Sequence, residues 1–146
     1  MMVYIDADGC PVTRLAVSIS KRYNLSCTIV CDSAHCFETD YAKVIVTSTG
    51  ADSVDYKITN MLRHGDIVVT QDYGLAAMSL SRGAYPINQN GIVFTDDNID
   101  AFLNSRALYA KIRRSGGRHK GPPKRTEKEN AEFEKSFCEL IESLLL

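Results

Sequence analysis

The sequence predicts a three-layer α/β fold in which a mostly parallel sheet carries helices on both faces. Short apolar runs of strand length alternate along the chain with segments whose apolar residues recur at helical spacing. Continuous apolar strands are typical of a sheet buried on both sides, and their alternation with helices favours parallel pairing. The 146 residues, of which 45% are hydrophobic, suit one domain over residues 1–146.

The first half of the chain alternates expected strands and helices. Residues 2–5 are an apolar run that ends at Asp6, and Pro11 suits the first position of a helix over residues 11–23. The further elements expected here are strands over residues 27–31 and 43–47, and a helix that begins after Asp52.

The second half continues the alternation and ends in a long helix. Residues 66–70 read as a buried strand, and residues 75–80 as an apolar helix. Residues 114–123 are rich in Gly, Pro and basic residues and are expected to form a loop. The remaining expected elements are short strands over residues 85–87 and 91–94, a helix over 97–113 and an amphipathic helix over 126–145.

Composition narrows the class of protein. No apolar run reaches the roughly 18 residues that span a membrane, and no signal peptide is visible before Val3, so we expect a cytoplasmic protein without a membrane partner. The formal net charge of −1 gives the whole molecule no polyanion-binding character. Five cysteines, an odd number, do not indicate a disulfide framework in a chain of this length.

Carboxylates follow several of the expected strands. Asp6 and Asp8 follow the first strand, and Thr70 and Asp72 follow the fourth with the same spacing. Asp55 lies in the first turn of the helix after the third strand. The carboxyl ends of parallel strands share one edge of a sheet, where ligands bind in such folds. We therefore expect these side chains to meet at that edge.

Such a cluster favours a divalent cation. Two carboxylates about 4 Å apart repel by roughly 4 kcal/mol at an effective dielectric constant near 20. An all-oxygen ligand set prefers Mg²⁺ or Mn²⁺, with Asp6, Asp8, Asp55 and Asp72 as candidate ligands. Asp52 is better explained as a helix N-cap, as are Asp96 and Asp97, although these two are also candidates for a fourth acid.

Three ordered motifs resemble the bacterial YaiI/YqxD family, also called UPF0178 or DUF188. They are IDADGCPV at residues 5–12, TGADSVD at 49–55 and GDIVVTQDY at 65–73. Gly121-Pro122 and the closing helix match as well, so the resemblance covers essentially the whole chain. Gly9 stands where the family pattern has Ala, a change that should not disturb the carboxylates.

The family is in turn similar to the PIN-like superfamily of metal-dependent nucleases. This likeness implies a PIN-like fold and hydrolysis of phosphodiester bonds, with RNA as the expected substrate. It assigns catalytic roles to Asp6, Asp55, Thr70 and Asp72, and Asp8 is expected to complete the metal shell. Metal ions in such sites activate water and neutralise charge on the phosphate.

Two other functions fit parts of the sequence. Asp6-Ala7-Asp8-Gly9 also resembles the opening of a haloacid-dehalogenase-type phosphatase, with Asp6 as nucleophile and Asp8 as general acid. Thr47 would then bind phosphate and Asp66 would supply the last acid, although Asp66 precedes its strand and should lie at the opposite edge. The second alternative is a catalytically silent module that binds RNA or a protein.

The cysteines give weaker signals. Cys27, Cys31, His35 and Cys36 lack a close Cys-x-x-Cys pair, so a buried strand position explains the first two better than zinc. Cys10 lies at a helix start beside the acids, and a structural role is favoured.

A basic loop near residues 111–125 is the second functional signal. Its charges could follow a phosphate backbone without reading base sequence. A solvated loop without a ligand is the alternative. The candidate nucleic-acid contacts are Arg113, Arg114, Arg118, Lys120 and Lys124, accompanied by Lys111, His119 and Arg125.

Overall fold

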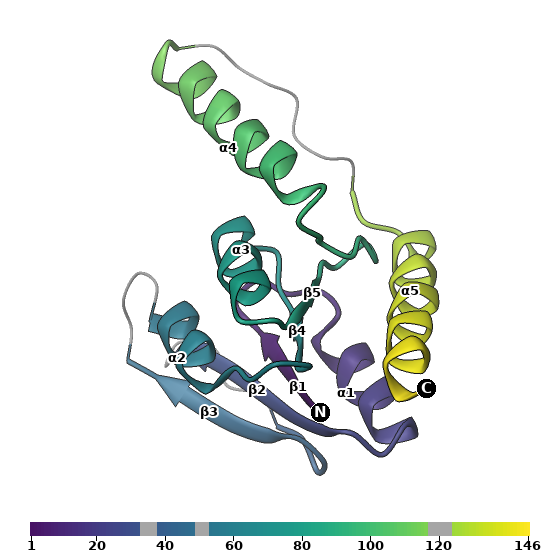
Figure 1. Ribbon diagram of the computed structural model, residues 1–146. Coiled ribbons are helices and arrows are strands. Elements are labelled where there is room, and N and C mark those ends of the chain that lie inside the picture. The colour runs from purple at the N-terminus through teal and green to yellow at the C-terminus, as the bar shows by residue number, and fades with distance from the viewer. Residues whose placement is uncertain (33–37, 49–52, 117–123) are drawn as a thin grey trace.

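The computed structural model describes residues 1–32, 38–48, 53–116 and 124–146. The strands of this described part form one parallel sheet with the order β3-β2-β1-β4-β5 (Figure 1). The strands are β1 (Met2–Asp6), β2 (Ser26–Asp32), β3 (Lys43–Thr47), β4 (Ile67–Val69) and β5 (Tyr85–Ile87). The helices are α1 (Thr13–Arg22), α2 (Ser53–Met61), α3 (Tyr73–Ser81), α4 (Ile99–Arg114) and α5 (Glu127–Leu145).

The central strand β1 carries Asp6 at its carboxyl end. It pairs with β2 on one side, with Asp6 opposite Val30, and with β4 on the other. The outer strands show edge features: Val46 of β3 is 49% exposed, and β5 contains Pro86, which lacks a backbone N–H. The middle of the sheet is therefore the place where polar residues that follow the strands are most enclosed.

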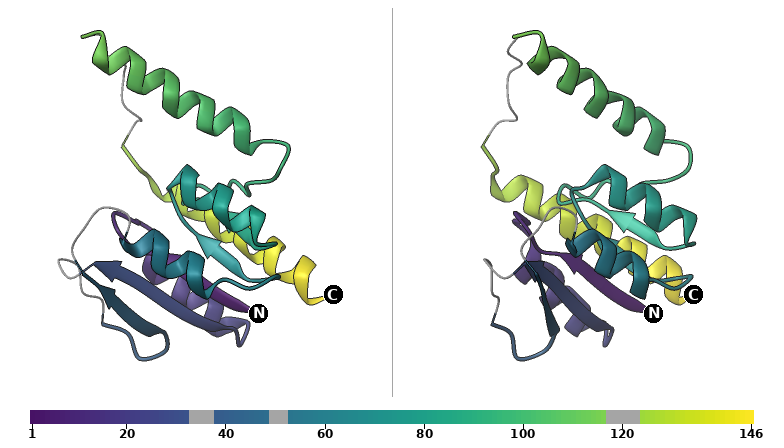
Figure 2. Two further views of the ribbon diagram at one scale, coloured as in Figure 1. Left: turned by 60° about the vertical axis from the view of Figure 1, so that its left-hand side comes forward. Right: turned by 90° about the vertical axis from the view of Figure 1, so that its left-hand side faces the viewer.

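Helices cover both faces of the sheet (Figure 2). On one face, α1 and α5 bury a cluster that joins Phe133, Phe137 and Ile141 of α5 to the inward side chains of β1 and β2. On the other face, Val54 and Ile58 of α2 and Leu75 of α3 pack on Tyr4, Val30 and Val68. Each fully buried side chain of this size contributes about 1.5–3 kcal/mol to folding.

Helix α4 lies outside these layers. Its first turns pack on α3 through a cluster that includes Ala76, Phe94, Ile99 and Phe102. Tyr73, Phe94 and Phe102 form three mutual ring contacts, with centroids 5.1 to 5.9 Å apart. The C-terminal end of α4 projects away from the sheet (Figures 1 and 2).

The predicted fold class is confirmed, and most predicted elements occur within a few residues of their expected bounds. The strand predicted over residues 91–94 is wrong, because only one isolated antiparallel bridge joins Val93 to Ile87. Residues 88–92 instead form a turn closed by the bond from Asn88 N to Ile92 O. The predicted N-cap Asp52 lies outside the described residues. No helix in the described ranges is long and apolar enough to cross a bilayer.

Candidate active site

The carboxyl edge of the sheet holds a pocket of about 480 Å³. Three segments build it: the loop after β1, the first turn of α2 and the loop after β4. The structure thus brings together the four aspartates that the sequence predicts at this edge. The lining residues are Asp6, Asp8, Gly9, Ser53, Val54, Asp55, Gln71 and Asp72.

Asp6 is the most enclosed of these acids, with 9% of its surface exposed. Burial raises the pKa of its carboxyl to about 6, and the negative charges of Asp8 and Asp72 add to this rise. The hydroxyl of Thr70 donates a 2.8 Å hydrogen bond to Asp6 Oδ2, which opposes the rise in pKa. Asp6 is therefore a carboxylate whose negative charge is costly until a cation or a proton neutralises it.

Thr70 and Asp72 fix the loop after β4. Thr70 is buried, and its Oγ1 accepts a 3.0 Å bond from the Asp72 backbone N–H. Asp72 is the N-cap of α3, and its Oδ1 accepts from Leu75 N at 2.9 Å. The capping role was not part of the sequence prediction for Asp72. The cap uses Oδ1 of Asp72, and Asp72 still lines the pocket.

The loop after β1 is held from two sides. Asp8 Oδ1 accepts from the backbone N–H of Asp32 at 3.3 Å, and Gly9 O accepts from Gln71 Nε2 at 2.7 Å. Gly9 has φ +68°, a conformation that glycine adopts without strain, and a Cβ there would meet nothing closer than 4.0 Å. The Gly9 departure from the family pattern therefore leaves the carboxylates in place.

The start of α2 contributes Asp55, which is half-buried on the pocket wall. The neighbouring Ser53 donates to Ser48 O at 2.7 Å, and its hydroxyl lies 3.0 Å from that of Thr47. Thr47 Oγ1 also donates to Cys31 O at 3.3 Å. Thr47 thus joins β3 to β2 and to the start of α2, a structural task that differs from phosphate binding.

The donor set of the pocket consists of hard oxygens, which suits Mg²⁺ or Mn²⁺. Within the described ranges, no three His, Cys, Asp or Glu side chains converge closely enough to hold one ion. Asp8 and Asp72 each accept a hydrogen bond from a backbone N–H with one carboxylate oxygen. The residues fit a cation chemically, and holding one requires their carboxylates to move closer together.

Asp66 lies away from this pocket, at the opposite edge of the sheet. It is buried, and its two oxygens accept from Met2 N at 3.0 Å and from Arg63 N at 2.9 Å. Met2 is the first residue of β1, whereas Asp6 is the last. Asp66 therefore cannot act together with Asp6, and the arrangement needed for the phosphatase alternative is absent.

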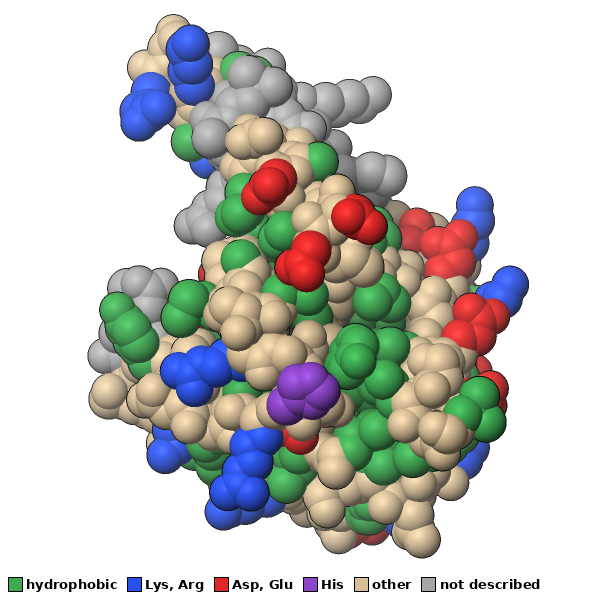
Figure 3. Space-filling view, in the orientation of Figure 1, with side chains coloured by type: hydrophobic (Ala, Val, Ile, Leu, Met, Phe, Trp, Pro, Cys, Tyr) green, Lys and Arg blue, Asp and Glu red, His purple; other side chains and the backbone are tan. Residues whose placement is uncertain are grey.

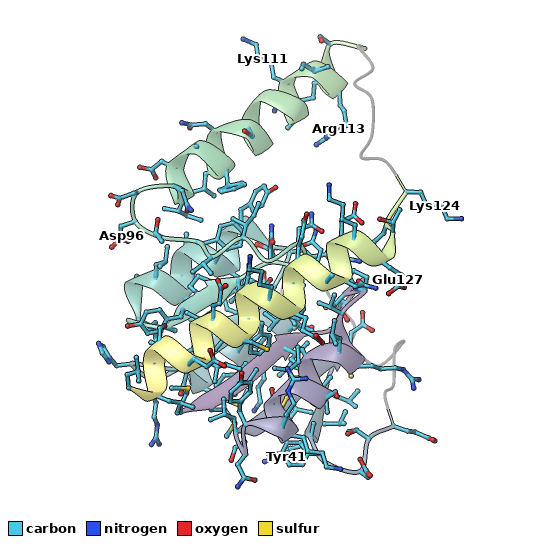
Figure 4. The ribbon with its side chains drawn as sticks, turned by 90° about the vertical axis from the view of Figure 1, so that its right-hand side faces the viewer. Tyr41, Asp96, Lys111, Arg113, Lys124 and Glu127 are labelled. Carbon is cyan, nitrogen blue, oxygen red and sulfur yellow. The ribbon has the colours of Figure 1, made fainter. Side chains whose placement is uncertain are left out.

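Asp96 and Asp97 supply neither a fourth acid nor a cap. Both are exposed in the segment before α4, where Figure 4 labels Asp96, and neither lines the pocket. The N-cap of α4 is Asn98, whose Oδ1 accepts from Thr95 N at 2.8 Å. Both roles suggested for these two aspartates were wrong, because the helix begins one residue later than their caps would need.

The described cysteines behave as structural residues. Cys27 and Cys31 are buried in β2, and burial raises the pKa of the Cys27 thiol to about 11. Burial also raises the pKa of Cys10, so its thiol is protonated at neutral pH. His35 and Cys36, the other candidates for a zinc site, lie outside the described residues.

The predicted basic segment is divided between two elements. Lys111, Arg113 and Arg114 are exposed on the last turn of α4. Figure 4 labels Lys111 and Arg113 at the projecting end of this helix, where Figure 3 shows basic side chains in blue. Lys124 is exposed just before α5 (Figure 4). The candidates outside the described residues are Arg118, His119 and Lys120.

Arg125 differs from these exposed cations, because its guanidinium binds the chain itself. It donates to Asn130 Oδ1 at 2.9 Å, to Asn90 Oδ1 at 2.8 Å and to Gln89 O at 2.6 Å. Sequence patterns did not predict this role of Arg125 or the contact between Gln71 and Gly9. Both depend on partners distant in sequence, although the position of Gln71 directly between Thr70 and Asp72 gave a hint.

Comparisons with known proteins give one family. The family model described as "Uncharacterized BCR, YaiI/YqxD family" matches residues 4–143. A UPF0178 protein of Exiguobacterium sibiricum is 51% identical over 141 residues, which cover 97% of this chain and 96% of the relative. Similar proteins of Clostridium acetobutylicum (41% identical; 97% of both chains) and Ruminiclostridium cellulolyticum (43%; 97% of this chain and 92% of the relative) carry the same UPF0178 name. No solved structure matches significantly. The chain therefore belongs to the YaiI/YqxD family, also named DUF188, together with these UPF0178 proteins.

Proposed function

We propose that this protein is a metal-dependent nuclease that hydrolyses phosphodiester bonds in RNA. One observation carries the proposal. Four aspartates from three separate segments line one pocket at the carboxyl edge of a parallel sheet, and the central one, Asp6, is buried. Like charges gathered in this way destabilise the fold unless they serve to bind a cation.

The residues of the pocket have two roles in this proposal: the aspartates bind the metal, and Thr70 positions them. Asp6, Asp55 and Asp72 would hold Mg²⁺ or Mn²⁺, with Asp8 completing the shell. A bound ion of this kind supplies an acidified water and neutralises charge on a phosphate. Thr70 orients Asp6 through its 2.8 Å bond and sets the chain direction at Asp72, so it is a positioning residue. The pKa of about 6 leaves Asp6 mostly ionised at neutral pH and ready to bind a cation.

Capture of the substrate falls to the basic segment. Lys111, Arg113 and Arg114 form an exposed cationic surface at the end of α4, and Lys124 adds to the charge before α5. Contacts from such side chains go to phosphates, which makes binding independent of base sequence. A cytoplasmic location, where RNA is plentiful, is part of this proposal.

A cleavage assay tests the function. Wild-type protein with Mg²⁺ or Mn²⁺ should shorten a 5′-labelled single-stranded RNA, and EDTA should stop the reaction. Asp6→Asn and Asp72→Asn should each lower the rate by about a hundredfold or more, because the lost metal contributes several kcal/mol to the transition state. Asp96→Asn, which changes an exposed aspartate outside the pocket, is the matched control and should cleave like wild type.

Two results would overturn the proposal. The first is wild-type protein that cleaves neither RNA nor DNA in the presence of any divalent cation. Equal rates for the wild type and both pocket variants would mean that the cleavage comes from elsewhere. Either result favours the silent binding module.

A further inference from the structure

A second pocket, of about 310 Å³, adjoins the acidic one. Gly9 and Gln71 line both pockets, so the two meet at the contact between the loops after β1 and β4. The remaining wall comes from the turn after β5 and from the start of α5. The residues that line only the second pocket are Pro11, Gln89, Asn90, Arg125 and Glu129.

The two pockets together contain one positive charge. Of the described residues that line them, Arg125 alone is a cation. The other charged lining residues are the four aspartates of the acidic pocket and Glu129 of the second. A nucleic-acid strand carries a negative charge at every linkage, so these carboxylates repel each linkage that is not bound to a metal ion. Arg125 is the lining residue that can offset this repulsion beside the aspartates.

The guanidinium of Arg125 is fixed by the chain itself. Its Nε donates to Asn130 Oδ1 at 2.9 Å, and its two terminal nitrogens donate to Asn90 Oδ1 at 2.8 Å and to Gln89 O at 2.6 Å. A guanidinium has five N–H donors, so a side chain with these three bonds can still donate to an anion. Because Arg125 is half-buried and already ordered, it loses little conformational entropy when it binds a ligand.

The turn that accepts two of these bonds is set by its own contacts. Asn88 is buried, and its Oδ1 accepts from the backbone N–H groups of Asn90 and Ile92, both at 2.9 Å. Gly91 has φ +86°, and a Cβ there would lie 2.7 Å from a carbonyl oxygen of α5. Glycine therefore allows the turn to approach the helix closely, and the guanidinium is held between two elements that are already in place.

Asp6 and Arg125 both act on the thiol of Cys10, which lies in the chain between Gly9 and Pro11. Burial raises the pKa of this thiol, the charge of Asp6 adds to the rise, and the charge of Arg125 opposes it. Interactions between charges fade over roughly 8–10 Å in a solution of physiological salt concentration. The acidic pocket and the guanidinium are therefore close enough to contact neighbouring groups of one ligand.

We propose that Arg125 binds the phosphate of the substrate strand that is next to the phosphate held at the aspartates, so that the second pocket is a phosphate subsite. This inference rests on the proposed nuclease function and adds a second contact with the substrate to it. The planar donors of a guanidinium match the oxygens of a phosphate. A contact of this kind is independent of base sequence, as are those proposed for the basic segment.

Glu129 limits the strength of this subsite. Its Oε2 accepts from the backbone N–H of Thr126 at 2.9 Å, as part of the capping box that begins α5. Its negative charge lies on the wall of the second pocket and opposes a phosphate there. Glutamine also serves in a capping box, so Glu129→Gln removes the charge and keeps the cap.

Trinucleotides with altered linkages test the proposal. NMR titration would compare a uridine trinucleotide, which has two phosphodiester linkages, with the two isomers in which one linkage is a neutral methylphosphonate. Ca²⁺ would replace Mg²⁺ to slow cleavage. Each isomer keeps one charged linkage for the aspartates and leaves none for Arg125. Wild-type protein should bind the fully charged trinucleotide at least about tenfold more tightly than either isomer, as expected for a hydrogen bond to a charged group.

Three variants assign the effect to the second pocket. Arg125→Gln should bind the three trinucleotides about equally. Glu129→Gln should bind the fully charged trinucleotide about twofold to threefold more tightly than wild type does, and the isomers as wild type does. Lys128→Gln removes an exposed positive charge from the first turn of the same helix, so it is the matched control and should keep the wild-type difference. An unchanged rise of melting temperature with Mn²⁺ would show that each variant is folded with an intact acidic pocket.

Four outcomes would overturn the proposal, and the nuclease function would survive each of them. The first is wild type that binds the isomers as tightly as the charged trinucleotide. The second is a folded Arg125→Gln variant that keeps the wild-type difference. If Arg125→Gln does not fold, the third is Glu129→Gln with wild-type affinity for the charged trinucleotide. The fourth is wild type that cleaves longer RNA but binds no trinucleotide. Failure to cleave any nucleic acid, by contrast, would remove the nuclease function as well.

Discussion

The hydroxyl of Thr70 lies 2.8 Å from Oδ2 of Asp6 and joins the carboxyl ends of two adjacent strands, β4 and β1. The hydroxyl oxygen of Thr70 also accepts a 3.0 Å hydrogen bond from the backbone N–H of Asp72. One buried side chain therefore sets the position of two acids on neighbouring loops.

Loss of this hydroxyl should weaken the fold and the site together. Thr70→Val keeps the shape of the side chain but leaves Asp6 Oδ2 and Asp72 N without their partner. Urea denaturation should show a loss of about 1–3 kcal/mol in the free energy of unfolding. Thr70→Ser keeps the hydroxyl and is the control, and it should recover most of that loss. A valine variant as stable as the serine variant would show that the bond contributes nothing.

Stability without metal should fall as pH rises through the range in which Asp6 ionises. The pKa of Asp6 is raised from 3.8 to about 6, so between these values the folded state binds the proton that the unfolded state has lost. The free energy of unfolding should therefore decrease from about pH 4 to about pH 6 and then level off, by at most about 3 kcal/mol for a rise of roughly two pKa units.

The control for this pH effect is Asp6→Asn, which cannot titrate. In EDTA, the melting temperature of Asp6→Asn should not show the fall between about pH 4 and pH 6 that Asp6 causes in wild type. Asp96→Asn should show the same dependence of melting temperature on pH as wild type. Saturating Mn²⁺ should reverse the wild-type trend, because metal binds the ionised carboxylate and its affinity rises with pH. A profile shared by wild type and Asp6→Asn would place the titrating group elsewhere.

Two substitutions at Asp72 should separate its cap from its ligand role. Asparagine is as good an N-cap as aspartate, so Asp72→Asn should keep or slightly raise the metal-free melting temperature, since one repelling charge is removed. Asp72→Ala loses the bond to Leu75 N and should lose about 1 kcal/mol. Both variants should lose most of the melting-temperature rise that Mn²⁺ gives wild type. If Mn²⁺ raises the melting temperature of Asp72→Asn as much as that of wild type, Asp72 is not a metal ligand.

The end of α4 should contribute the salt-dependent part of RNA binding. The slope of log affinity against log salt for single-stranded RNA changes by about 0.7 for each phosphate contact. The double variant of Arg113→Ala and Arg114→Ala should flatten this slope and weaken two unrelated sequences alike, with its Mn²⁺ response intact. Lys128→Ala with Lys135→Ala, two exposed lysines of α5, is the charge-matched control. An unchanged slope in the arginine variant would remove α4 from the binding surface.

Sequence patterns predicted the elements that depend on local signals. The strands of the sheet are apolar runs that end in polar residues, and the helices between β1 and β2, β3 and β4, and β4 and β5 favour their parallel arrangement. The strand expected at residues 91–94 does not form, because the buried side chain of Asn88 accepts hydrogen bonds from the backbone N–H groups of Asn90 and Ile92. Side-chain capture of this kind leaves no periodic signal in the sequence.

The site was predictable only in part, for a similar reason. Positions after strands are enough to place Asp6, Asp8 and Asp72 at one edge, because the topology of a parallel sheet fixes that edge. Sequence spacing gave no sign that Asp72 caps α3, or that Arg125 binds a turn 35 residues before it. The hollow lined by Gln89, Asn90 and Arg125 depends on the long-range bonds of Arg125, and the sequence therefore did not predict it.

The proposed nuclease function requires the aspartates at the carboxyl edge of the sheet to hold a divalent cation. Anomalous diffraction from a crystal soaked in Mn²⁺ would locate the metal independently of any activity. We predict a peak within coordination distance, about 2.0–2.4 Å, of carboxylate oxygens of Asp6 and Asp72, with Asp8 or Asp55 as a further ligand. Saturating Mn²⁺ that leaves this pocket without a peak, or that binds only at other carboxylates, would contradict the claim.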